Sequence, residues 1–179
     1  MKAVGLCTHF TEADEWAFDY ALKLVQTKHL QLNICHWLES PYQIRRDLVY
    51  NDLFNHKNVV PVTPGILNKL ELKLREYYEP KLRNFTDVAF KLCEGAYQVE
   101  LIRCFRQNFL DLVVMGYQEP VAAVTSAEQP MDLFAMHLPY PVIIVGKDGP
   151  ETFLLNHRAA EMHDVLVLPA DGWQILEPA

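Results

Sequence analysis

EGAYQVELIRCFRQNFLDLVVMG, residues 94–116, joins a Glu-Gly turn, an amphipathic helix and a buried strand that ends on Gly116. Open α/β folds bind their ligands at the carboxyl edge of the sheet, where a strand of this kind ends. This stretch therefore predicts the fold class and also the place where a functional site should lie.

Strand and helix patterns alternate on both sides of this stretch. Helical spacing of apolar residues predicts helices, the first with a capping box of Thr11 and Asp14 and the second opening on Thr63 and Pro64. Short apolar runs predict strands over 2–8, 30–38, 88–93, 111–115 and 141–145, and helices lie over 11–26, 63–77, 99–105 and 130–138. Residues 39–61 read as an irregular connection with one helical turn around 44–53. Because parallel strands need crossover connections, we predict an α/β, single-domain, open five-stranded parallel sheet with helices on both faces.

The last residues form a separate part of the pattern. We divide the chain into a domain of residues 1–146 and a C-terminal extension of residues 147–179. In the extension we expect a short helix over 156–163 and a β-hairpin, in which 165–168 and 173–176 flank the turn sequence Pro-Ala-Asp-Gly. A lone hairpin is marginal, so it either covers its own domain or reaches a partner chain.

Composition excludes several classes of function. The net charge of -7 opposes binding to nucleic acid and to an anionic membrane surface. Apolar runs are too short for a signal peptide or a membrane span, so we expect a cytoplasmic protein. Four widely spaced cysteines form no CxxC pair, and we interpret them as buried, reduced thiols.

Four segments, in order and with matching spacing, carry a resemblance to a known family. They are VGLCTHFTEADEWAFDYALKLV (4–25), LNICHWLESP (32–41), the EG to DLVVMG unit (94–116) and PYPVIIVG (139–146). Over residues 1–146 the chain resembles the universal stress protein, or UspA-type, domain. The resemblance implies a Rossmann-like fold of the adenine nucleotide alpha hydrolase type and a homodimer formed through the last strand.

The loop after Gly116 departs from the nucleotide-binding members of that family. Those members have Gly-x2-Gly-x9-Gly followed by Ser or Thr, because backbone N–H groups must approach the phosphates closely. Here Glu119 stands at the second glycine, and Gln129 and Pro130 stand at the Gly-Ser positions. His9 and Phe10 replace the Asp and Gly of the first turn. We therefore expect no ATP binding through the usual loop and no cofactor.

A candidate ligand pocket is nevertheless expected at the carboxyl edge of the sheet. Its residues are Thr8, His9, His36, Glu94, Gly95, Gly116, Tyr117 and Glu119. Two imidazoles and two carboxylates could in principle hold zinc, but a strand-end role for His9 and the family's common residue at His36 favour a structural reading, and we predict no metal. Thr125 and Ser126 lack a neighbouring His in the sequence, so we predict no catalytic residue.

Two functions follow as hypotheses. The first is a non-enzymatic stress-response protein that acts as a homodimer and uses its surface or a modified pocket in regulation; a protein partner is possible, but the sequence does not identify it. The alternative is a protein that binds ATP, AMP or another small molecule in a modified pocket. A hydrolase of related architecture would need a phosphate loop or a catalytic group that the sequence does not contain.

Overall fold

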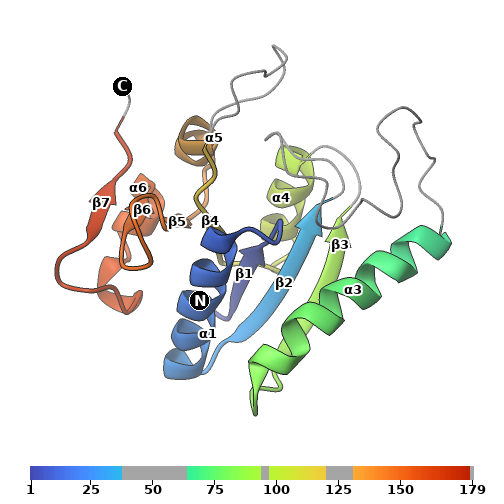
Figure 1. Cartoon of the computed structure of the whole chain (residues 1–179). Helices are drawn as coiled ribbons and strands as arrows, with labels where there is room; N and C mark the ends of the chain where they lie inside the picture. The colour runs from blue at the N-terminus through green and yellow to red at the C-terminus, as the bar shows by residue number, and fades with distance from the viewer. Residues whose placement is uncertain (38–63, 94–96, 120–130, 178–179) are drawn as a thin grey trace.

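The computed structural model describes residues 1–37, 64–93, 97–119 and 131–177 (Figure 1). The helical turn expected around residues 44–53 lies outside these ranges. So do the candidate residues Glu94 and Gly95, and the loop positions Gln129 and Pro130.

A mostly parallel sheet runs through the molecule. Five strands occupy the predicted places: β1 (Ala3–Cys7), β2 (Gln31–Trp37), β3 (Val88–Cys93), β4 (Leu112–Gly116) and β5 (Val142–Val145). Their order is β3-β2-β1-β4-β5, and every neighbouring pair among them is parallel. The predicted parallel arrangement of these five strands is confirmed, and two further strands extend the sheet beyond β5.

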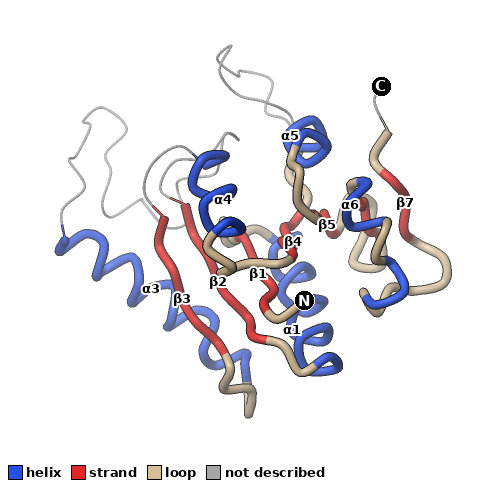
Figure 2. The backbone as a smooth tube through the Cα atoms, turned by 180° about the vertical axis from the view of Figure 1, so that it is seen from behind, coloured by secondary structure: helices blue, strands red, loops and turns tan. Residues whose placement is uncertain are grey.

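Helices cover both faces of this sheet (Figures 1 and 2). They are α1 (Glu12–Lys28), α3 (Pro64–Leu82), α4 (Tyr97–Arg106) and α5 (Met131–His137). One core joins α1 and α3 to the sheet through residues such as Phe18, Leu24 and Tyr78. The other joins α4 and α5 to the opposite face through residues such as Phe105 and Phe134. Alternate residues of the strands enter opposite cores, as the two-residue repeat of a strand requires.

The start of α1 follows the sequence pattern directly. Thr11 is the N-cap; its side chain accepts from the Asp14 N–H, and the Asp14 carboxylate accepts in return from the Thr11 N–H. The two groups satisfy donors that the first turn of a helix would otherwise leave open. The capping box predicted from the sequence is confirmed.

The predicted C-terminal hairpin is wrong. The extension contains β6 (Phe153–Leu155), α6 (His157–Ala160), a 3₁₀ helix η1 (His163–Val165) and β7 (Trp173–Ile175). β6 pairs antiparallel with β5, and β7 pairs parallel with β6, so the sheet has seven strands. Parallel strands cannot be joined by a tight turn. The apolar run 165–168 instead begins at the end of η1 and is not a strand, and Val167 has a φ of 53°. The Pro-Ala-Asp-Gly turn then brings the chain alongside β6.

Candidate functional site

The strand order fixes where a site can lie. The chain moves from β1 to β2 on one side and later returns to β4 on the other side of β1. The carboxyl ends of β1 and β4 therefore flank the point at which the order reverses, where open α/β sheets bind ligands. Thr8, His9 and Phe10 follow β1, and Gly116 ends β4.

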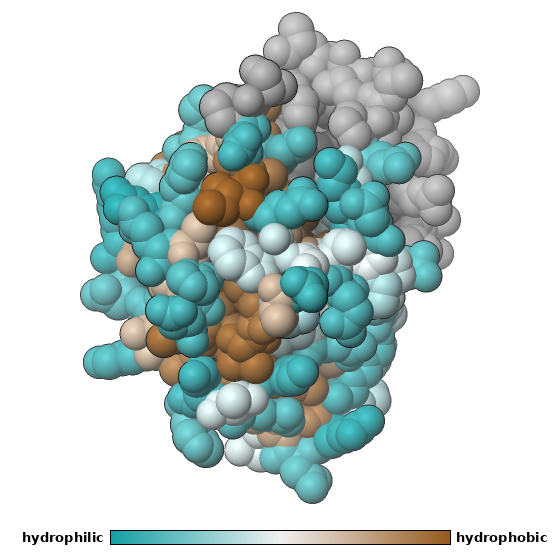
Figure 3. Space-filling view, turned by 90° about the vertical axis from the view of Figure 1, so that its left-hand side faces the viewer, coloured by the Kyte–Doolittle hydropathy of each residue, from teal (hydrophilic) through white to brown (hydrophobic). Residues whose placement is uncertain are grey.

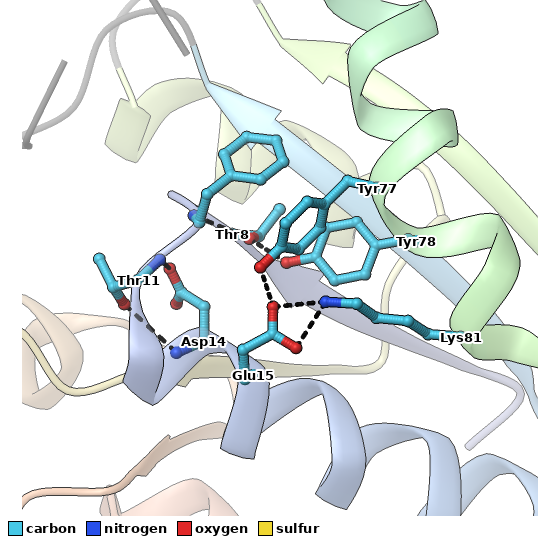
Figure 4. A network of polar contacts seen from close by, with 8 residues as sticks. Thr8, Thr11, Asp14, Glu15, Tyr77, Tyr78 and Lys81 are labelled. Carbon is cyan, nitrogen blue, oxygen red and sulfur yellow. Dashed lines mark hydrogen bonds and ion pairs between the residues drawn. The ribbon is translucent and has the colours of Figure 1, made fainter. Parts of the chain in front are cut away.

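The buried carboxylate of Asp14 lies at this edge, next to Thr11 at the start of α1 (Figure 4). It accepts from the His9 N–H at 2.8 Å, the Thr11 N–H at 3.0 Å and the Gly116 N–H at 3.2 Å. Three backbone donors from the β1–α1 turn and the end of β4 thus point at one anionic group of the chain itself. Burial raises the pKa of Asp14, and the N–H hydrogen bonds act against that rise because they stabilise the charged form.

Gly116 is needed for the close approach of β4 to α1. A Cβ atom at this position would lie 2.4 Å from the Ala13 carbonyl carbon and 2.4 Å from the Asp14 nitrogen. Both are backbone atoms, so no side-chain rotation could relieve the contact. The glycine that the sequence marks as a ligand position therefore has a packing role, and its N–H group is bound to Asp14.

Two buried histidines lie beside the carboxylate. The rings of His9 and His36 are 5.9 Å apart, edge to face, and His36 Nδ1 donates to the Thr8 carbonyl at 2.9 Å. Burial is the main cause that lowers the pKa of each to about 4, and for His36 repulsion by His9 contributes to the lowering. Both imidazoles are therefore neutral at pH 7.

Aromatic rings occupy the space in front of β1 and β2. Phe10, at a φ of 62°, lies 5.5 Å from the His36 ring, 5.0 Å from the Tyr77 ring and 6.0 Å from the Tyr78 ring. Tyr78 is fully buried, and its hydroxyl shares a hydrogen bond with the Thr8 hydroxyl. Phe10 thus adopts a left-handed conformation that favours glycine, at the position where the resembling family has glycine. We call Phe10, His36, Tyr77 and Tyr78 the ring cluster.

A polar bridge between α1 and α3 closes the outer side of the ring cluster (Figure 4). Glu15 accepts from the Tyr77 hydroxyl, and both of its oxygens lie 2.6 Å from Lys81 Nζ. The Lys81 ammonium lies 3.7 Å from the centre of the Tyr77 ring, a cation–π distance. The bridge joins the two helices that cover this face.

The structure brings together half of the predicted pocket residues. Thr8, His9, His36 and Gly116 meet around the Asp14 carboxylate and the ring cluster. Tyr117 is half-buried just after β4, and its N–H donates to the Val145 carbonyl, while Glu119 is exposed. Glu94 and Gly95 are outside the described residues.

Sequence reasoning did not find three residues of this site: Asp14, Tyr77 and Tyr78. The capping box identified Asp14 as part of a helix start. No pattern in the sequence indicated that its carboxylate accepts a hydrogen bond from the Gly116 N–H, 102 residues away. The stripe of apolar residues identified Tyr77 as part of a packed helix face. The helical spacing therefore indicated that Tyr77 packs against the core, and only the folded structure shows that Tyr77 also lies in the site.

Other features of the described residues bear on binding. Within the ranges that the structure covers, no group of three His, Cys, Asp or Glu side chains could hold a metal ion. None of the helices described is long and apolar enough to span a bilayer. A hollow of about 530 Å³ lies where α1 and α3 end, lined in part by His29 and Arg83, and another of about 330 Å³ lies between α1 and the extension.

Comparison with known proteins identifies the fold. No protein-family model matches the sequence, and no curated protein matches it. A universal stress protein from Archaeoglobus fulgidus matches in structure with a TM-score of 0.52 and 10% identity, covering 80% of this chain and 97% of that chain. A protein of the universal stress protein family from Burkholderia pseudomallei matches with a TM-score of 0.51 and 17% identity, covering 80% and 95%. The chain therefore has the fold of the UspA-type universal stress protein domain.

Proposed function

We propose that the chain is a non-enzymatic regulatory protein of the stress response, similar to the universal stress proteins, that does not bind ATP through the usual glycine loop. It acts in the cytoplasm and needs no cofactor. The observation that carries the proposal is the Asp14 carboxylate, which accepts three backbone N–H groups at the switch point of the sheet.

Phosphates bind at such an edge because clustered N–H groups point at them. Here the donors of His9, Thr11 and Gly116 are already bound to an internal anion. A phosphate would have to displace Asp14 or approach it, and two anions repel each other strongly in a buried site. Hydrogen bonds to a charged group are worth about 1.5–3 kcal/mol each, so a ligand that lacks these donors loses much of its affinity.

The ring cluster supports the same proposal on the nucleoside side. The positions that would meet a nucleoside in the resembling family are His9 and Phe10, and here both side chains pack inward. Phe10 contacts His36, Tyr77 and Tyr78. A base would have to displace Phe10 and the aromatic contacts it makes, each worth about 0.5–1.5 kcal/mol.

The experiment is to release small molecules from freshly purified protein for mass spectrometry, and to titrate the protein with ATP and AMP by calorimetry. We expect no stoichiometric nucleotide, and a Kd weaker than about 1 mM for both nucleotides. Near-stoichiometric AMP, ADP or ATP would overturn the proposal and favour the alternative, a nucleotide-binding protein with a modified pocket.

The expected homodimer stays a prediction, and the fold limits where it can form. β6 pairs with β5 along Ile143, Ile144 and Val145, so the chain itself covers the edge of its fifth strand. A dimer must therefore use another surface. Native mass spectrometry of the full chain measures the oligomeric state in the same experiment as the released ligands.

A further inference from the structure

We propose that the free edge of β7 binds an extended, basic segment of another protein, which adds a strand to the sheet. β7 is separated from β4 by β5 and β6, so this surface is distinct from the site around Asp14. The inference goes beyond the proposed function, and a nucleotide experiment does not test it.

The backbone of β7 offers hydrogen-bonding groups along its outer side. β7 is the last strand of the sheet in the described part of the chain. The Gly172 carbonyl accepts from Phe153 at 2.8 Å, and the Leu176 N–H donates to Leu155 at 2.8 Å. Because successive residues of a strand turn their backbone groups to opposite sides, Trp173 and Ile175 direct their N–H and C=O groups away from β6. The edge thus presents two donors and two acceptors.

Apolar side chains lie beside these groups. Ile175, within β7, is 40% exposed. Trp173 is half-buried, and its ring stacks on His163 at 5.4 Å. Figure 3 views the molecule from this side and shows brown, hydrophobic surface bordered by teal side chains. Alternate side chains of an added strand would have apolar surface to contact.

Charge selects the kind of strand that fits. Asp171 and Glu177, both exposed, flank the edge. The extension, residues 147–179, has six carboxylate side chains and two basic ones, so it carries -4 of the net charge of -7. No Lys or Pro lies in Trp173–Ile175 to block pairing, as many natural edges have. A segment with basic residues at both ends complements this surface in charge.

The same charges disfavour a second copy of the chain. An antiparallel pair that uses both outward residues of each copy places Trp173 opposite Ile175. That register also places Asp171 opposite Glu177, twice in the dimer. Like charges directly opposite destabilise a strand pair. The edge therefore disfavours pairing with β7 of a second copy and favours a basic segment of another protein.

The test uses the full chain and the peptide acetyl-Lys-Thr-Val-Thr-Val-Thr-Lys-amide, whose lysines are six residues apart, as Asp171 and Glu177 are. NMR hydrogen exchange measures the amides of Trp173 and Ile175, and titration measures the Kd. We expect both amides to gain protection, and the peptide to bind about tenfold more tightly than the same peptide with Glu at both ends. This ratio should fall as salt screens the charges.

Two variants separate charge from backbone pairing. D171N/E177Q keeps the strand and should weaken binding of the Lys peptide about fivefold. Ile175→Pro removes one outward N–H and should abolish binding, with thermal unfolding as the check that it folds. Equal binding of the two peptides, or no protection at Trp173 and Ile175, would overturn the proposal. Protection of the Trp173 and Ile175 amides that increases with protein concentration, in the absence of peptide, would also overturn the proposal. The edge would then be bound by a second copy of the chain.

Discussion

Asp14 performs two tasks with one carboxylate. It closes the capping box of α1 and it binds the end of β4 through the Gly116 N–H. A cap is ordinarily worth about 1 kcal/mol, whereas a buried anion that satisfies several donors is worth more, because its loss leaves those donors without an acceptor.

We expect Asp14→Asn to lower the free energy of unfolding by about 2–4 kcal/mol, since an amide brings one N–H₂ group against donors that need an oxygen. Urea denaturation at neutral pH measures the change. Asp19→Asn is the matched control on the same helix, because Asp19 is exposed and should cost less than about 0.5 kcal/mol. Equal losses in the two variants would contradict the role given to Asp14.

Gly116→Ala should be among the most damaging single substitutions, at about 3 kcal/mol or more, because the new methyl group meets backbone of α1. Gly5→Ala is a suitable comparison. There the added Cβ meets the methyl ends of Leu110, 2.6 Å away, which can shift. Thermal unfolding of both variants ranks the costs, and a Gly5 variant as unstable as the Gly116 variant would argue against this account.

At the scale of single residues, the sequence predicted which residues lie at the site better than it predicted which residues contact each other. It marked His9, His36 and Gly116 as neighbours because strand ends meet at one edge of a parallel sheet. It also marked Thr11 and Asp14 as a cap, since that contact is local. The bond from Asp14 to Gly116 and the contacts of Phe10 with α3 depend on the packing of distant segments, which no local pattern encodes.

The ends of β1 and β2 make stability depend on pH. The pKa of His9 and of His36 lies near 4 in the folded chain, against 6.5 for an unperturbed histidine. Between these values the unfolded chain binds more protons, so stability is present above pH 6.5 and is lost as the pH falls toward 4. Asp14, whose pKa burial raises above 3.8, acts in the opposite direction over its own range.

From pH 8 to pH 5, we expect each buried imidazole to remove about 2 kcal/mol from the free energy of unfolding. Urea denaturation over this range measures the slope. His36→Asn, whose amide can still donate to the Thr8 carbonyl, should remove about half of it. A profile unchanged by H36N would contradict the assignment.

At the scale of elements, the five parallel strands and the four helices that cover them were predictable from the sequence. Each has a long apolar pattern or an explicit start signal. β6 was missed because three residues, Phe153–Leu155, are too few to show alternation. The false hairpin had the opposite origin: a good turn sequence lay between two apolar runs, but only 173–176 found an open edge to pair with, at β6.

The extension is an integral part of the whole molecule. Phe153, Leu155 and Leu166 belong to the same buried core as α1 and α3, and Leu154 and Leu176 belong to the other core. Burying one such side chain is worth about 1.5–3 kcal/mol. The sheet runs without a break across residue 146, from β5 into β6.

A chain ending at Gly146 should therefore self-associate or precipitate, because it exposes the edge of β5 and the apolar surface that the extension covers. Light scattering coupled to size exclusion measures the mass. A chain ending at residue 170 keeps β6 paired with β5 and should self-associate less. Comparison of the two truncated chains gives the contribution of the exposed β5 edge. A fragment of residues 1–146 that is as stable and dispersed as the full chain would show that the extension is dispensable.

The long reach of the Asp14–Gly116 bond also sets an order of events during synthesis. Its partners are 102 residues apart, and β1 pairs with β4 across a similar separation. Ribosomes add about 5–20 residues per second, so about 5–20 s pass between the two ends of this bond. Throughout that interval one side of β1 lacks its neighbour, and the nascent chain holds an incomplete sheet whose apolar edge is open to chaperones and to other nascent chains.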